Sequence, residues 1–288
     1  MPAHHGCAFL AQRQGSLPVP DTEKNKNHIN INWLIFGTSL AILPPTIQKE
    51  HDINLKGNMM TKTPVCLLLL GALAASSPAM AALDGNIGVS SNYLWRGISQ
   101  TGDAVALDGG IDYSHDSGFY AGFWASNVDF GDDTTFELDL YGGYSGQITE
   151  AIGFDVGYLY YGYPDADADI DFGELYASLS WEWLTLGYAR VIHAGNDLAP
   201  DGLSDDDMDY LSAEVSIPLS DSLSLDFHYG YSSGDVVSSW YDESSYSDYS
   251  AAITKSTDLG DVSFIVSDTD LDGDDPKVAL RWAYSFGL

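Results

Sequence analysis

Cysteine is nearly absent from this chain of 288 residues, and basic residues are scarce. Both cysteines, Cys7 and Cys66, lie in the first 81 residues, so the rest of the chain can form no disulfide and no cysteine metal site. Lysine and arginine number 11 against 42 acidic residues, a formal net charge of -31. That charge excludes nucleic acid as a partner, because phosphates need a basic surface. The 45% of hydrophobic residues argues against disorder.

Long apolar runs are also missing, since none reaches the roughly 18 residues that a membrane-spanning helix needs. Residues 59–81 hold a short basic start, a brief apolar core and a small-residue end of the A-x-A type. We expect this segment to be a secretory signal peptide, cleaved after Ala81. Because a signal begins a chain, residues 1–58 are predicted to be a spurious extension from a start codon assigned too early; a genuine longer N-terminal region is the alternative. The mature protein would then be residues 82–288.

From residue 82 onward the hydrophobic pattern has a period of two. Apolar residues alternate with carboxylates in Phe136–Tyr141, and residues 223–231 alternate large apolar side chains with serine, aspartate, histidine and glycine. Such alternation predicts strands with one apolar and one polar face. Twelve segments of this kind are expected, roughly at 85–98, 104–115, 118–129, 134–146, 151–163, 170–181, 183–193, 208–218, 222–233, 247–257, 261–269 and 276–288.

The connections between these segments differ in length. Those after even-numbered segments are short, and those after odd-numbered segments are generally longer and acidic. This asymmetry predicts an all-β protein, an antiparallel transmembrane β-barrel of about twelve strands with short periplasmic turns and longer acidic extracellular loops, in the bacterial outer membrane. A soluble β-sandwich or lipocalin-like barrel is the alternative.

The last predicted strand has one apolar face up to the carboxyl terminus, ending at Leu288. It resembles the signal by which outer-membrane proteins are recognised by their assembly machinery, although those strands usually end on phenylalanine. Aromatic residues near strand ends are expected to form girdles at the two membrane interfaces. The residues assigned to these girdles are Tyr93, Trp95, Tyr120, Trp124, Tyr158, Tyr160, Trp181, Tyr229 and Trp282.

If the apolar faces meet lipid, the polar faces line the lumen. The residues predicted to line the pore are Arg96, Asp108, Asp112, Glu137, Asp139, Asp155, Glu174, Glu214, Asp226, His228, Lys255 and Arg281. The excess of carboxylates predicts a channel for small solutes with a preference for cations. The alternative is a plugged structural or adhesive barrel, in which these charges pair and the acidic loops bind divalent cations or a surface partner.

One acidic loop matches the D-x-D-x-D-G opening of a calcium-binding EF-hand loop, with Asp268, Asp270, Asp272 and Asp274 as candidate ligands. Position twelve of that pattern is Ala279 instead of the bidentate glutamate. A loosely bound divalent cation such as calcium is therefore a weak prediction, shared either with Asp205, Asp206 and Asp207 or with lipopolysaccharide phosphates. A solvated acidic loop is the alternative. No other cofactor is expected.

No enzymatic activity is expected. A barrel phospholipase needs a serine–histidine pair near the outer lipid boundary. His193 is the one histidine of the mature chain at the outer end of a predicted strand.

Four stretches of the chain resemble one family of proteins. They are Ser91–Gln100 (SNYLWRGISQ), residues 109–132, Glu137–Gly146 (ELDLYGGYSG) and Phe172–Trp181 (FGELYASLSW). They resemble the TorF family of porin-type proteins, also known as Gcw-type bacterial outer-membrane proteins of unknown function. The similarity is specific over residues 85–190 and looser from there to the end. It implies an outer-membrane barrel with a channel role and brings no catalytic or ligand-binding positions with it.

Overall fold

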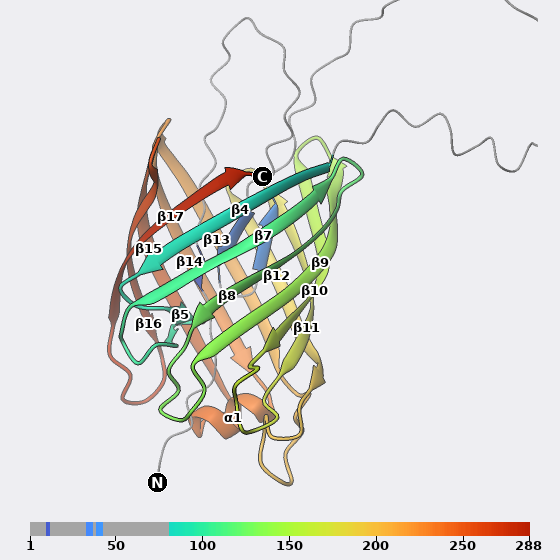
Figure 1. The fold of residues 1–288 in the computed structure, drawn as a ribbon, viewed down its shortest axis with the longest axis vertical. Helices are drawn as coiled ribbons and strands as arrows, with labels where there is room; N and C mark the ends of the chain where they lie inside the picture. The colour runs from blue at the N-terminus through green and yellow to red at the C-terminus, as the bar shows by residue number, and fades with distance from the viewer. Residues whose placement is uncertain (1–9, 12–32, 37–38, 43–80) are drawn as a thin grey trace, which may run out of the picture.

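The alternating pattern forms the wall of one closed barrel in the computed structural model, which describes residues 10–11, 33–36, 39–42 and 81–288 (Figure 1). The predicted signal segment up to residue 80, and most of residues 1–58, lie outside the described residues. The wall strands are β4 (Ala81–Ser90), β7 (Ala106–His115), β8 (Phe119–Asn127), β9 (Phe136–Thr149), β10 (Ile152–Gly162), β11 (Phe172–Trp181), β12 (Leu184–Ala194), β13 (Asp209–Ser220), β14 (Leu223–Ser233), β15 (Ser245–Thr257), β16 (Gly260–Thr269) and β17 (Lys277–Gly287).

Every wall strand is antiparallel to both of its neighbours, and the last strand closes the ring on the first. β17 pairs with β4, from Arg281 opposite Ser90 to Gly287 opposite Asp84. Closure gives every wall strand a hydrogen-bonded partner on each side, so the sheet has no open edge. The prediction of an antiparallel barrel with twelve strands is confirmed.

Five further short strands and one helix complete the described elements, and two of these strands form a hairpin after β4. β1 (Leu10–Ala11), β2 (Trp33–Phe36) and β3 (Ser39–Ile42) form a separate sheet, and β3 contacts β10, β11 and β12. The helix α1 (Asp235–Tyr241) lies between β14 and β15. Among the described residues, no helix is long and apolar enough to cross a membrane.

The apolar faces of the wall strands point outward. Each strand exposes a large apolar side chain, and the exposed fraction is 49% for Leu140, 54% for Leu175 and 44% for Phe227. On the opposite face, Glu137 and Asp139 of the same strand as Leu140 are completely buried. A soluble barrel has the reverse polarity, with apolar residues inside and polar residues in water. The outer surface therefore suits a hydrocarbon environment.

The two ends of the barrel differ as predicted. In Figure 1 the short turns and the carboxyl terminus lie at the top, and the long loops with α1 lie at the bottom. Near the short-turn end, the rings of Trp282, Tyr284 and Phe286 on β17 stack in a row with centroids 6.2–6.4 Å apart. Such rows of aromatic side chains are typical of the interface girdles of outer-membrane barrels.

Substitution of Val156 by arginine tests the outward apolar face. Val156 lies near the middle of β10 and is 45% exposed, so V156R should lower the free energy of unfolding in lipid vesicles by about 2–4 kcal/mol. The matched control is Val262→Arg near the short-turn end of β16, opposite Lys255, where the expected cost is about 0–1 kcal/mol. Urea titration of barrels folded into vesicles measures both values, and equal costs would contradict the proposed depth of the two positions.

Candidate functional site

Residues 91–105 leave the wall after β4 and fold into the barrel as a hairpin (Figure 1). Its strands are β5 (Leu94–Trp95) and β6 (Ile98–Ser99), joined by Arg96 and Gly97. Both turn residues have positive φ, 45° and 82°, which is the backbone of a two-residue type I′ hairpin. We call residues 91–105 the lumen hairpin. The sequence-based prediction of a wall strand running to residue 98 is therefore wrong, because β4 ends at Ser90.

The tip of the lumen hairpin packs tightly against the wall. A Cβ atom on Gly97 would lie 2.4 Å from Cγ2 of Thr269 and 3.0 Å from Cβ of Asp248. These residues belong to β16 and β15, so the tip contacts two neighbouring wall strands. A larger residue at position 97 would meet both a strained backbone and this close approach.

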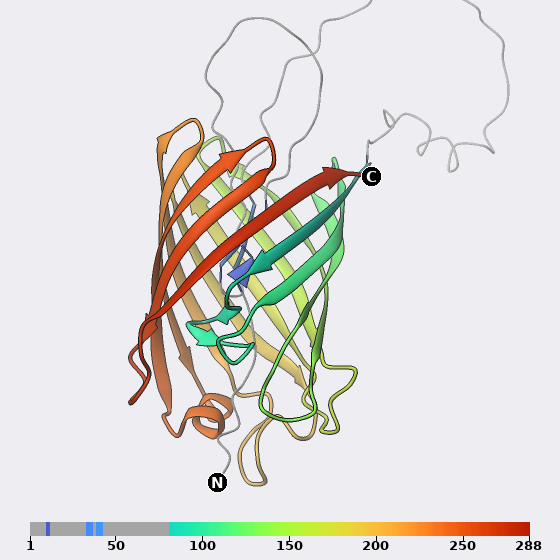
Figure 2. The ribbon, with the colours of Figure 1, turned by 60° about the vertical axis from the view of Figure 1, so that its left-hand side comes forward.

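The short strands of the lumen hairpin can be followed in the ribbon after β4 (Figure 2). Arg96, at the turn of this hairpin, connects it to the wall. Its Nη2 donates to Oε1 of Glu174 on β11 at 2.6 Å, and both side chains are at most 1% exposed. Its Cζ lies 4.2 Å from the ring centroid of Trp95 and 4.0 Å from that of Tyr210 on β13. Burial lowers the pKa of Arg96, but Glu174 raises it, and the net shift is upward. The guanidinium therefore stays charged between two aromatic faces and a carboxylate.

A second contact ties the lumen hairpin to β9. The hydroxyl of Tyr93 donates to Oε1 of Glu137 at 2.7 Å. Burial and the Glu137 carboxylate raise the pKa of Tyr93 well above its usual value, so this hydroxyl remains a donor. Asp139, two residues further along β9, is fully buried, and among the described residues neither of its carboxylate oxygens has a hydrogen-bond partner. The carboxylate oxygens of β9 beside the hairpin therefore outnumber the hydrogen-bond donors that contact them.

Other polar clusters fill the lumen. Arg281 on β17 grips Asp108 on β7 with two hydrogen bonds, from Nη1 to Oδ2 at 2.6 Å and from Nη2 to Oδ1 at 2.7 Å. Tyr120 on β8 donates to Oδ1 of Asp155 on β10 at 2.7 Å. Each contact joins two wall strands that flank a third, β17 and β7 over β4, and β8 and β10 over β9, so polar contacts cross-link the inner face of the wall.

A further cluster contains the histidine of the inner face. Nε2 of His228 lies 3.0 Å from Oδ1 of Asp248, and its Nδ1 lies 3.7 Å from Oε1 of Glu214. The hydroxyl of Tyr210 lies 2.9 Å from the same Nε2. The ring of this tyrosine is the one that packs against the guanidinium of Arg96. His228 on β14 thus lies between the carboxylates of Glu214 on β13 and Asp248 on β15, and it also contacts Tyr210, which supports the lumen hairpin.

The structure places most of the predicted pore-lining residues on the inner side of the wall. Asp112 is part-buried and accepts hydrogen bonds from Asn86 and Tyr141. The buried ones are Asp108, Glu137, Asp139, Asp155, Glu174, Glu214, Asp226, His228 and Arg281.

Two of the predicted pore-lining residues need correction. Arg96 is inside the barrel, but it extends from the lumen hairpin and not from a wall strand. Lys255 is exposed on the outer face of β15, in register with the apolar side chains of Leu223 and Val262. Its place near the short-turn end explains the error, because a lysine there can extend along the apolar surface to water.

Four of the predicted girdle aromatics are also inside the barrel. Tyr93, Trp95, Tyr120 and Trp124 are at most 5% exposed. The first two belong to the lumen hairpin, and the other two lie on the inner face of β8. Because tyrosine and tryptophan have polar atoms, they suit a polar lumen as well as an interface.

The aspartates of the acidic loop after β16 do not converge on a common point where they could bind one ion. Asp274 accepts from Thr269 at 2.7 Å and forms an ion pair with Lys277, and Asp270 accepts from the backbone of Ser247 at 2.6 Å. In the part of the chain that the structure describes, no three metal-binding side chains are placed to share an ion. Calcium binding by Asp268, Asp270, Asp272 and Asp274 remains a prediction.

His193, the residue considered for an enzymatic site, lies near the end of β12 that leads into the long loop before β13. Its ring is exposed and lies 6.1 Å from the ring of Tyr160. A tilted ring contact with an aromatic residue at the long-loop end is an ordinary position at a membrane interface. The expectation that the protein is not an enzyme stays a prediction.

The aromatic shell around the lumen hairpin was not predicted. The ring of Trp95 meets those of Tyr161, Phe172 and Trp240 at centroid distances of 6.2–6.4 Å. Alternation places Tyr161 and Phe172 on an inner face, but only the folded hairpin shows what they surround. The Arg-Gly pair at 96–97 is the local signal that could have indicated a tight turn.

A closed barrel with an apolar exterior and a polar lumen defines a transmembrane-type β-barrel. The chain belongs to the family described as bacterial protein of unknown function (Gcw_chp), which it matches over residues 72–285. The Gcw-type part of the resemblance is thereby confirmed, and the narrower TorF name remains a prediction. No curated protein matches the chain in sequence.

Solved porin structures share the barrel architecture at low similarity. The KdgM porin is 7% identical, with a TM-score of 0.46, and the match covers 73% of this chain and 99% of that one. OprD from Pseudomonas aeruginosa is 14% identical, with a TM-score of 0.35, and the match covers 72% of this chain and 67% of that one. The function of this protein is therefore inferred from its own residues.

Substitution of Arg96 by glutamine should loosen the lumen hairpin. The change leaves the buried Glu174 carboxylate without its ion-pair partner, which costs about 3–5 kcal/mol. Backbone amides of residues 93–100 should then exchange with deuterium much faster than in the unmodified protein. The control is Arg190→Gln, because Arg190 is 44% exposed where it pairs with Asp207 and Asp209 and should change stability by about 0–1 kcal/mol. Unchanged exchange in R96Q would show that Arg96 does not hold the hairpin.

Proposed function

We propose that this protein is a bacterial outer-membrane channel that passes small solutes and prefers cations. The outward apolar face supports placement in a membrane, and complete closure of the wall removes every unpaired backbone group from the lipid. The short-turn end, which holds the carboxyl terminus, would face the periplasm, and the long acidic loops would face outward.

The charge of the lumen carries the cation preference. Its two guanidiniums are each engaged by a carboxylate, Arg96 by Glu174 and Arg281 by Asp108. In the described part of the chain, no lysine or arginine forms a salt bridge with Glu137, Asp139 or Asp155, which are also inside. A lumen with unneutralised carboxylates concentrates cations and repels anions.

The lumen hairpin is proposed to be the gate of this channel. It lies inside the barrel and contacts the wall strands β9, β11, β15 and β16. Conduction would require the hairpin to move away from Glu174 and Tyr210. An ion pair and two ring contacts form a discrete closed state that the hairpin can leave as a unit.

The same burial favours a second candidate function, a plugged structural or adhesive barrel. Arg96, Glu137 and Glu174 are at most 1% exposed, as expected of charges that fill a closed lumen. In that case the acidic loops would be the working surface, binding divalent cations or a surface partner. The two candidates differ in whether ions cross.

Several partners follow from a place in the outer membrane. Outer-membrane lipid would cover the apolar belt, and lipopolysaccharide would surround the loop end. The outer-membrane assembly machinery would recognise β17, whose outward side chains Val278, Leu280, Tyr284 and Phe286 are 38–56% exposed.

We also propose that residues 59–81 are removed on export. The first wall strand begins at Ala81, so cleavage after this residue would leave the rest of the wall intact. Mass spectrometry of the protein isolated from outer membranes should then give an N-terminus at Ala82. A terminus far upstream would exclude both the signal peptide and the spurious origin of residues 1–58.

Conductance of the folded protein in planar bilayers tests the channel. Under a potassium chloride gradient, the zero-current potential should show that potassium permeates better than chloride. Glu137→Gln combined with Asp139→Asn should lower the ratio of cation to anion permeability about fivefold, the effect of about 1 kcal/mol in the lumen. The control is Lys255→Gln on the outer face, which should leave the ratio unchanged.

R96Q gives the channel proposal a second readout. Loss of the Glu174 contact should raise the fraction of time that the channel is open. A folded barrel that conducts in neither the unmodified form nor R96Q would favour the plugged alternative. Preference for chloride would show that the arginines, and not the carboxylates, control permeation.

A further inference from the structure

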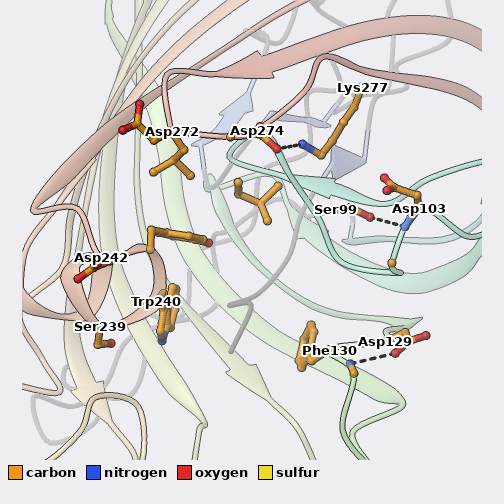
Figure 3. A pocket seen from close by; sticks show the side chains of 16 residues that line it. Ser99, Asp103, Asp129, Phe130, Ser239, Trp240, Asp242, Asp272, Asp274 and Lys277 are labelled. Carbon is orange, nitrogen blue, oxygen red and sulfur yellow. Dashed lines mark hydrogen bonds and ion pairs between the residues drawn. The ribbon is translucent and has the colours of Figure 1, made fainter. Parts of the chain in front are cut away.

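A cavity of about 940 Å³ lies at the long-loop end, beside the lumen hairpin (Figure 3). Four segments far apart in sequence converge on it: the hairpin from Ile98 to Asp103, residues 129–131 after β8, residues 239–242 at the end of α1, and residues 271–277, which lead into the first residue of β17. A concave space of this size, built where loops meet at the mouth of a barrel, is a usual location for a small-molecule site.

Aromatic and aliphatic side chains form one part of the cavity. Figure 3 shows Trp240 and Phe130 on different sides of the space. Nε1 of Trp240 donates to the carbonyl of Leu198 at 3.1 Å, and the ring of Phe130 contacts that of Tyr163 with centroids 5.6 Å apart. Both rings are therefore fixed by their neighbours before a ligand arrives, which lowers the entropy lost on binding.

Aspartates form a second part of the lining. Five line the cavity, namely Asp103, Asp129, Asp242, Asp272 and Asp274, against one basic residue, Lys277. Lys277 forms an ion pair with Asp274, so its charge is already balanced. No salt bridge to Asp242 or Asp272 is present in the described part of the chain. The cavity consequently combines aromatic rings with an excess of negative charge, and Phe130 and Trp240 each lie close to an aspartate.

We propose that this cavity binds organic cations, with the charged nitrogen among the aspartates and the apolar part against Trp240 and Phe130. Aromatic faces attract cations and also accept apolar groups. The acidic lining repels anions, and a neutral solute can contact the aromatic rings but gains no electrostatic attraction from the aspartates. An inorganic ion fits poorly, because no three metal-binding side chains among the described residues are placed to share one.

The site deepens the proposed channel function and rests on it, since it names the class of solute that would gather at the mouth. The ring of Trp240 lies 6.2 Å from that of Trp95, the residue next to Arg96 in the lumen hairpin. A bound cation would thus be separated from the gate by two aromatic rings. From there it would pass to the carboxylates inside the lumen.

Isothermal titration calorimetry on the full barrel folded in detergent tests the proposal without requiring conduction. The probe is benzyltrimethylammonium, with benzyl alcohol as its neutral counterpart and phenylacetate as its anionic one. The cation should bind saturably and at least about tenfold more tightly than either counterpart. Equal binding of benzyl alcohol, tighter binding of phenylacetate, or absence of cation binding up to about 20 mM would overturn the proposal.

Substitutions locate the binding. Asp242→Asn with Asp272→Asn should weaken binding of benzyltrimethylammonium about three- to tenfold. The control pair, Asp167→Asn with Asp201→Asn, removes the same charge from loop positions outside the cavity and should have little effect. Equal weakening by both pairs would show attraction by net charge and no built site.

The aromatic contact needs its own variants. Trp240→Leu should weaken cation binding about fivefold, and Phe130→Leu keeps this part testable if loss of Trp240 disturbs the hairpin. Unchanged binding in both variants would overturn the aromatic half of the site. Binding in detergent together with absent conductance would reject the channel and leave the cation site standing, whereas conductance without binding would reject the site alone.

Discussion

Closure of the sheet by β17 against β4 is the constraint on which the rest of this structure depends. A closed wall leaves no strand edge, so its backbone polar groups are satisfied without water. Alternation then gives each strand one face toward the outside and one toward the lumen. With the apolar residues outside, every charge of the wall interior must find its partners within one confined space.

The lumen hairpin meets that requirement by bringing a guanidinium and several aromatic rings into the acidic interior. Arg96 neutralises Glu174 and rests on Trp95 and Tyr210, and Tyr93 donates to Glu137. The hairpin cannot neutralise all of the acid, because it carries a single basic residue. Both the lumen and the cavity at the long-loop end carry excess negative charge, and the proposal of cation preference rests on this shared property.

The assignment of Lys255 to the lumen is wrong because it followed the charge of the side chain and not its place in the alternating pattern of the strand. Lys255 has the parity of Ile253 on the outer face of β15, yet its charge led to its assignment to the lumen. At the end of a strand a lysine can lie outside, since its ammonium group reaches water beyond the apolar belt. The predicted wall strand to residue 98 is wrong for another reason. Tyr93 and Trp95 of the lumen hairpin continue the alternating pattern of β4, although the chain leaves the wall after Ser90.

The sequence by itself determined the twelve strands, the direction of their faces and the end that carries the long loops. These features are local, because a side chain on a strand points to one face or the other at every step. Only the tertiary structure decided which inner residues meet. Arg96 and Glu174 are 78 residues apart, and their contact depends on strand order, stagger and an inward fold of one loop. No period along the chain encodes such a contact, because it arises only when the barrel has closed.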